Sequence, residues 1–282
     1  MKLAVNYSET LLSLLEIHPD LPVDYIKVPT IPFPGCWRQI ERGATYRKLL
    51  PHLAQSGVIA LGHPHPEQRF QAGTVLEVLG VTGAKYLSTH IDAKVDYFPE
   101  LAEFQHQRQA ELERRLKEQF LSAIVEVKRQ IPVPLVLENH PYYRWSRQYR
   151  SGSEPDFIGE LCEEGDCGFL LDIAHARCTA WFLRQPEAEL IMKMPLSRLR
   201  EIHLAGTHLR KEGLRDTHTA MTETDYALFE AVLRRAEPEI VSIEYGGLPD
   251  TITNPDGGYD PISRNDPAEL LLMIQRVKSI IG

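Results

Sequence analysis

The chain has few of the features that mark secreted, membrane or metal-thiolate proteins. It holds four cysteines in 282 residues and no Cys-x-x-Cys pair, so neither a disulfide scaffold nor a thiolate zinc site is indicated. No apolar run is long enough to span a bilayer. The N-terminal segment lacks the apolar core and small-residue cleavage site of a signal peptide. We therefore expect a cytoplasmic protein without a membrane partner.

The chain also has fewer basic than acidic residues. The net charge is −8 and the isoelectric point is about 5.8. Proteins that act on duplex nucleic acid usually carry a basic face, so this balance disfavours nucleic acid as a partner. Residues 108–129 are rich in arginine and lysine but also carry several glutamates, and we interpret them as the solvated face of a helix.

What the chain does contain is a regular alternation of short apolar runs and longer helical patterns. The runs predict strands at residues 2–6, 23–28, 58–62, 86–91, 135–138, 168–172, 200–204 and 240–245. The helical patterns cover residues 45–55, 67–79, 99–130, 154–163, 224–235 and 266–280. Most runs are continuously apolar, as in parallel strands buried on both faces. Eight such units in a chain of this length predict a single (β/α)₈ barrel over residues 1–282, with the Gly- and Pro-rich segment 246–261 as a loop at its mouth.

Metal-ligand side chains gather at or just after the carboxyl ends of these predicted strands, where barrel enzymes build their active sites. The set is His63, His90, Glu138, Asp172, His175, His203, Asp216, His218 and Glu244. Burying carboxylates in runs such as LVLE and FLLD is costly without a partner, and shared cations would remove that cost. Imidazoles and carboxylates without thiolate suit Fe²⁺, Zn²⁺ or Mn²⁺. Because nine ligands exceed what one ion can use, the pattern predicts two or three divalent ions.

Four further polar residues are candidates for contact with substrate. The motif GHPHP offers His65 beside His63, and either histidine could serve as the ligand of the third strand. His140 and His208 lie near the predicted rim, as substrate contacts or as surface histidines. Lys27 sits among apolar neighbours in the second strand, where it could bind a substrate anion or form a salt bridge.

Six motifs, in their order along the chain, resemble the xylose-isomerase-like barrel superfamily, to which apurinic endonuclease IV and sugar isomerases and epimerases belong. They are HID, VLEN, LLDIAH, EIHLAG, DTH and IEY. On the endonuclease pattern the nine ligands given above fall on trinuclear metal positions. The interval between His203 and Asp216 also matches that pattern.

Longer stretches are similar to the multinuclear non-haem iron-dependent oxidases, a family formerly described only as a domain of unknown function. They are LVLEN, EPDFIGELCEEGDCGFLLD, PLSRLREIHLAG, and DTH followed by ALFEAVLRR. Members modify cysteine in peptides with two or three irons and dioxygen, often with a partner protein that presents the peptide. The chain departs from many members after Asp172, where it has Ala174-His175 in place of asparagines. The resemblance implies iron as the metal and a peptide or small molecule as the substrate.

Three alternatives stay open. In a sugar isomerase using zinc or manganese, Glu138 or Glu244 would act as the catalytic group that moves a proton between substrate atoms. In a nuclease, metal-bound hydroxide would attack a phosphate, and the acidic balance ranks this reading lowest. A non-enzymatic, metal-binding partner protein could dock another chain through Trp37 or Tyr142-Tyr143, whose other interpretation is local packing.

Overall fold

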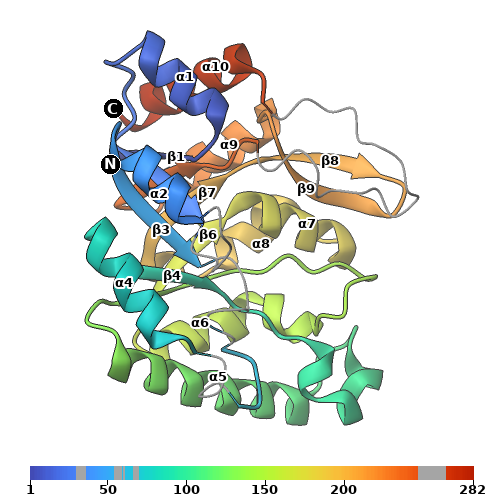
Figure 1. Cartoon of the computed structure of the whole chain (residues 1–282). Helices are drawn as coiled ribbons and strands as arrows, with labels where there is room; N and C mark the ends of the chain where they lie inside the picture. The colour runs from blue at the N-terminus through green and yellow to red at the C-terminus, as the bar shows by residue number, and fades with distance from the viewer. Residues whose placement is uncertain (30–35, 54–58, 60, 66–69, 247–264) are drawn as a thin grey trace.

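The computed structural model describes residues 1–29, 36–53, 59, 61–65, 70–246 and 265–282. Eight parallel strands close into a barrel in the order β1-β10-β7-β6-β5-β4-β3-β2 (Figure 1). These strands are β1 (Lys2–Asn6), β2 (Tyr25–Pro29), β3 (Lys48–Leu53), β4 (Leu87–His90), β5 (Leu135–Glu138), β6 (Gly168–Asp172), β7 (Leu199–Leu204) and β10 (Ile240–Ile243). The predicted (β/α)₈ fold is confirmed.

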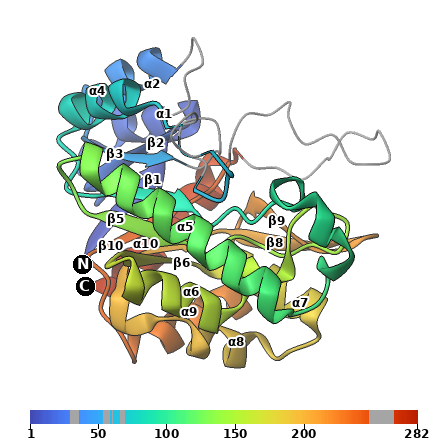
Figure 2. The same ribbon diagram turned by 90° about the horizontal axis from the view of Figure 1, so that it is seen from below.

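Helices cover the outside of the barrel (Figure 2). They are α1 (Glu9–Ile17), α2 (Cys36–Ala44), α4 (Ala72–Thr82), α5 (Ala110–Gln130), α6 (Pro155–Glu164), α7 (Ile173–Leu183), α8 (Glu187–Lys193), α9 (Glu223–Leu233) and α10 (Pro267–Ile281). Helix α5 buries one apolar stripe, while Arg114 on its other side pairs with Glu111 and Glu118. This arrangement confirms the solvated helix face expected there.

The third strand is the main error of the sequence prediction. Residues 45–55 were expected to be helical and 58–62 to form the strand, but β3 is Lys48–Leu53. Pro51 is unfavourable inside a strand because it cannot donate to a ladder. The structure tolerates it because β3 pairs with β4 only from His52 onward. Ile59 and Leu61 lie outside the strands but are buried, and this burial explains the apolar pattern that suggested a strand there.

An antiparallel hairpin follows β7 and was expected only as a loop. Strands β8 (Gly206–Arg210) and β9 (Gly213–Thr219) form a separate two-stranded sheet that extends away from the barrel (Figure 1). The hairpin matters because β9 carries Asp216 and His218, and it packs along α7. The motif DTH is thus fixed on a strand.

The inside of the barrel changes character along its axis. At the amino-terminal end a small apolar cluster closes the interior, formed by Ala4, Leu50, Tyr86, Val136, Leu170 and Ile240. Since side chains two residues apart share one face of a strand, the next inward positions lie one layer higher. Val136 is followed by Glu138, Leu170 by Asp172, and Leu50 by His52. A polar layer therefore sits on an apolar floor, toward the carboxyl ends of the strands.

Two aromatic residues and the mouth loop were also the subject of predictions. Tyr142 is buried and Trp37 packs against the core, which confirms local packing for these two aromatic residues. Apart from Gly246, the predicted mouth loop over 246–261 lies outside the described residues. Within the described part of the chain, none of the helices has the length and apolar character needed to cross a membrane.

Candidate metal centre

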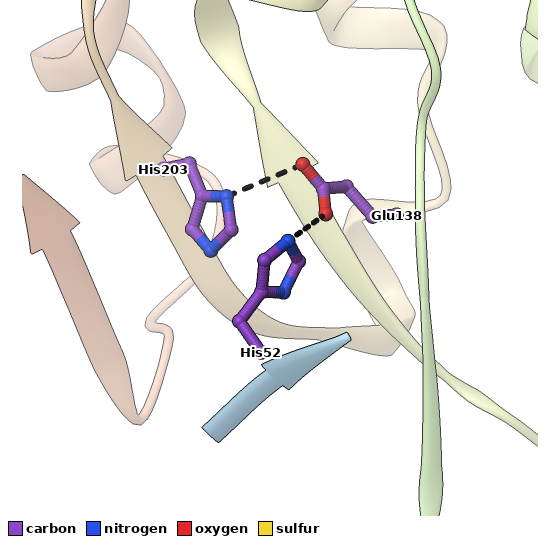
Figure 3. Close-up of side chains that lie close together, drawn as sticks. All are labelled: His52, Glu138 and His203. Atoms are coloured by element: carbon purple, nitrogen blue, oxygen red, sulfur yellow. Dashed lines mark ion pairs between the residues drawn. The ribbon is translucent and has the colours of Figure 1, made fainter. Parts of the chain in front are cut away.

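Glu138 lies at the centre of the polar layer. Its Oε2 atom is 3.2 Å from His52 Nε2 and 3.1 Å from His90 Nε2. Its Oε1 atom is 3.2 Å from His203 Nδ1 and 3.5 Å from His175 Nδ1. Figure 3 shows the carboxylate between His52 and His203, which reach it from β3 and β7. One carboxylate therefore faces imidazoles from several elements, as a ligand that bridges metal ions would.

A second group of donor atoms surrounds the same ring nitrogen of His203 that faces Glu138. Its Nδ1 atom lies 3.7 Å from Asp172 Oδ2 and 3.4 Å from Glu244 Oε1. Donor atoms of Asp172, His203 and Glu244 all lie within 4.8 Å of one another, the spacing at which a single ion could be held. All three residues are buried.

The third group includes the hairpin. Asp216 Oδ2 lies 3.1 Å from His218 Nε2 and 3.5 Å from His175 Nε2. His218 Nε2 is also 3.4 Å from Glu244 Oε2, which joins this group to the second one. His218 has a φ of 49°, a left-handed conformation that non-glycine residues adopt rarely and that clusters at functional sites.

Two buried carboxylate oxygens in these groups make no hydrogen bond within the described part of the chain. They are Glu138 Oε2 and Asp172 Oδ2. Buried polar atoms are almost always satisfied, because desolvating one without a partner costs about 1–3 kcal/mol or more. Buried carboxylate oxygens that face other metal-ligand atoms without forming hydrogen bonds to them fit a site built for cations.

The charges of the groups also call for cations. Burial alone would raise the pKa of Glu138, but His90, His203 and His52 hold it well below its usual range. Burial and Lys27 lower the pKa of His203, yet the carboxylates of Glu244 and Glu138 raise it to about 10. Likewise burial lowers the pKa of His218, but the carboxylate of Asp216 raises it to about 9. Without metal the carboxylates keep His203 and His218 protonated, and metal ions would supply the same positive charge.

Outer partners fix which ring nitrogen faces the centre. His52 Nδ1 is 2.9 Å from Ser88 Oγ, which leaves Nε2 toward Glu138. His175 Nδ1 is 2.9 Å from the carbonyl oxygen of Asn139, which leaves Nε2 toward Asp216. His203 Nε2 is 3.0 Å from Glu201 Oε1, which leaves Nδ1 for the second group. Metal-binding histidines are typically oriented in this way.

With this geometry described, comparison with known proteins gives the family. The family model described as "RiPP precursor modification enzyme MbnB/TglH/ChrH" matches residues 80–251, which is more than half of the chain. The chain belongs to this family. The matched range contains every donor residue described above except His52. It confirms the family suspected from the sequence.

Curated relatives match part of the chain, and solved structures share its fold. The chain is 33% identical over 113 residues to a UPF0276 protein of Caulobacter vibrioides, and 30% identical over 113 residues to one of Acaryochloris marina. Each match spans 39% of this chain and 40% of the relative's length. The fold is similar to that of 3-keto-D-glucoside 4-epimerase from E. coli, with a TM-score of 0.58, 14% identity and 99% and 98% of the two chains covered. It is also similar to that of endonuclease IV from Thermus thermophilus, with a TM-score of 0.56, 15% identity and 99% of both chains covered.

The third strand carries His52, not the His63 that was predicted to end it. The structure brings eight of the nine predicted ligands together and adds His52 of β3 beside Glu138, whereas His63 is not among the donor atoms that lie together in the described part of the chain. His63 was placed at the end of a strand predicted over 58–62, whereas β3 is Lys48–Leu53. It lies in a bend, where its ring packs edge-on against Tyr97 with 5.5 Å between the ring centroids. A signal for His52 was present, since it stands two positions after the inward-facing Leu50.

The expected substrate contacts lie in different places. His140 lies beside the centre, with its ring centroid 5.3 Å from that of His90. His65 is exposed and its backbone N–H donates to His63 Nδ1. His208 is half-buried on the hairpin, with Nδ1 3.4 Å from Thr219 Oγ1. Buried Lys27 forms a salt bridge with Glu244, as one of its two interpretations predicts.

Glu201 is a buried residue that the sequence analysis missed. Tyr86 and Ser242 donate hydrogen bonds of 2.6 and 2.7 Å to its carboxylate, which in turn contacts His203. Its signal was the two-residue spacing to His203, which puts both side chains on the inward face of β7.

Replacing each of the two histidines by alanine tests which of them binds metal. We expect His52→Ala to lower the metal content per chain, because His52 Nε2 faces Glu138. His63→Ala should keep the metal content of the parent protein. Elemental analysis of both variants, purified side by side without added metal, measures this difference. Equal metal loss in both variants, or loss in His63→Ala alone, would restore the original assignment.

Proposed function

We propose that the protein is a multinuclear, iron-dependent oxidase that modifies a cysteine-containing peptide with dioxygen as the oxidant. The proposal joins membership of a family of RiPP precursor modification enzymes, which act on ribosomally made peptides, to the three donor groups at the barrel mouth. The observation that carries it is the position of Glu138, whose two oxygens face histidines of different groups. Such a carboxylate serves an assembly of ions better than a single ion.

The donor groups suit three ions. The first would be held by His52, His90 and Glu138, and the second by Glu138, Asp172, His203 and Glu244. The third would be held by His175, Asp216 and His218. Iron bound there would supply one-electron chemistry with dioxygen. Imidazole and carboxylate donors without thiolate suit iron in its divalent state.

The chain's own residues prepare this centre before any substrate arrives. Asn139 accepts a 2.8 Å hydrogen bond from the Asp172 backbone N–H and donates one of 2.9 Å to the Asp172 carbonyl oxygen. These bonds lock the end of β5 to the end of β6. Glu138 and Asp172, one from each strand, are therefore held at a fixed separation, which is how preorganised sites avoid rearrangement during reaction.

His140 is the protein group best placed to contact a substrate at the centre. Its ring lies against His90 and His175, and burial together with His90 lowers its pKa to about 3. A neutral imidazole with so low a pKa is too weak a base to deprotonate a thiol, but it could accept a hydrogen bond from the S–H group of a substrate cysteine. This contact would orient the sulfur, whose thiolate is the form of cysteine that reacts and binds metals.

The isomerase alternative requires a carboxylate that is free to move protons on the substrate. Glu138 faces four imidazoles and Glu244 pairs with Lys27, so both carboxylates have positive partners. This arrangement favours metal binding over general base catalysis for both residues. Zinc or manganese bound in place of iron would nevertheless favour the isomerase alternative.

Metal analysis followed by a peptide assay tests the proposal. We expect two or three irons per chain in protein purified without added metal, with a mixed-valence signal in electron paramagnetic resonance. A cysteine-bearing peptide, with the peptide-presenting partner protein if one is required, should change mass only when both iron and dioxygen are present. Modification under strict exclusion of oxygen, or full activity of the zinc-loaded protein, would refute oxidase chemistry.

A further inference from the structure

A cavity of about 210 Å³ lies where the segment after β5 meets the end of α7. Its walls include three arginines, Arg144, Arg150 and Arg184, together with Tyr142 and Phe182. Three guanidinium groups around one hollow are unusual for a chain whose net charge is −8. The cavity is separate from the three donor groups, since none of their residues lines it.

Most of this positive charge is not neutralised within the described part of the chain. Arg150 Nε donates a 2.6 Å hydrogen bond to Glu154 Oε1, so one of the three guanidinium groups is paired. Arg144 and Arg184 are exposed, and neither makes an ion pair with the described carboxylates. Arg184 also has a left-handed φ of 56° at the end of α7, a position that favours glycine. An arginine there is better explained by its charge than by its backbone.

Tyr143 connects the cavity to the metal centre. Its ring packs edge-on against Phe182 of the cavity wall, with centroids 5.8 Å apart. Its hydroxyl oxygen accepts a 3.3 Å hydrogen bond from the backbone N–H of Asp216, a residue of the third donor group. One side chain thus contacts both a residue of the cavity wall and a residue of the third donor group.

The surface beside the cavity offers flat apolar faces. Trp145 stacks on Tyr143 with 4.7 Å between ring centroids and 10° between planes, yet 46% of it is exposed. Trp181, near the end of α7, is 47% exposed. Arg215 places its guanidinium 4.8 Å from the Trp145 ring centroid and adds a further positive charge. Exposed aromatic residues beside arginines are typical of surfaces that bind other chains.

We propose that this arginine cavity binds the carboxylate of an acidic residue in a peptide, next to the residue on which the metal centre acts. Guanidinium groups pair with carboxylates through two parallel hydrogen bonds, which fixes orientation as well as contributing affinity. The stacked Tyr143 and Trp145 would receive a neighbouring apolar side chain. The identity of the ligand rests on the proposed function, whereas the preference for an anion rests on the cavity alone.

The test is direct binding of a fluorescein-labelled tetraglutamate peptide, followed by fluorescence anisotropy. We expect the double variant Arg144→Gln/Arg184→Gln to bind it at least about tenfold more weakly, because both unpaired charges are lost. The matched control Arg114→Gln/Arg129→Gln removes two arginines from helix α5, and it should bind like the parent. Metal content should be the same in all three proteins.

Two further probes and one treatment separate this inference from the proposed function. A tetralysine peptide should not bind, and a thymidine oligonucleotide of equal length should bind more weakly than tetraglutamate. Binding should survive removal of metal by a chelator, because the cavity contains no metal ligand. Tighter oligonucleotide binding, equal binding by the double variant, or complete loss of binding after chelation would overturn the inference. Tetraglutamate binding by a protein that contains no iron as purified, before any chelation, would instead refute only the oxidase.

Discussion

Glu138→Gln is expected to remove most of the bound metal and, with it, activity. Glutamine keeps the size of the side chain but loses the charge, and its amide group cannot bridge two ions as a carboxylate does. Both oxygens of Glu138 now face histidines, and the residue is 1% exposed, so water cannot replace it. Loss of an outer partner alone lowers metal affinity about 10–100-fold, so loss of the bridging ligand should exceed that range. Elemental analysis and a competitive chelator titration measure the change.

A graded pair of controls makes this result specific. Glu201→Gln alters the outer partner of His203 and should weaken metal binding moderately. Glu126→Gln changes an exposed pair with Arg129 on helix α5 and should leave metal binding intact. Circular dichroism of each variant reports whether the barrel has folded. Full metal content in folded Glu138→Gln would show that the ions, if present, lie elsewhere.

The course of the chain explains which parts of the centre could be predicted from sequence. Glu138 and Asp172 end strands that are continuously apolar up to the carboxylate, and such runs in parallel strands are easy to recognise. His52 was missed because residues 45–55 were interpreted as a helix, and the proline in KLLPHL is unfavourable in a central strand. The barrel overrides that rule, since β4 begins to pair with β3 only after Pro51. Closure of the sheet is a tertiary effect that no local pattern contains.

The hairpin shows a different limit. Asp216 and His218 were identified from the motif DTH, yet β9, the strand that carries both, was not expected. Short polar strands lack the apolar alternation on which strand prediction depends. The arginine cavity was invisible for a similar reason. Its arginines stand at positions 144, 150 and 184, and only packing of the segment after β5 against α7 brings them together.

Lys27→Met tests the charge balance of the centre and should have its largest effect when metal is absent. Lys27 is 3% exposed, and its ammonium group pairs with Glu244 and lies 3.2 Å from His203 Nδ1. Breaking a buried pair from one side costs about 3–5 kcal/mol, because the remaining charge stays buried. For a chain of this size we expect the melting temperature of the metal-free protein to fall by roughly 10 °C. In the metal-loaded protein the ions would compensate Glu244, so the fall should be smaller. Lys117→Met, which breaks exposed pairs with Glu160 and Glu164, is the control and should change either melting temperature little. Equal losses in the metal-free and metal-loaded forms would mean that Glu244 keeps Lys27 as its partner when the centre is filled, and would exclude it from the ligand set.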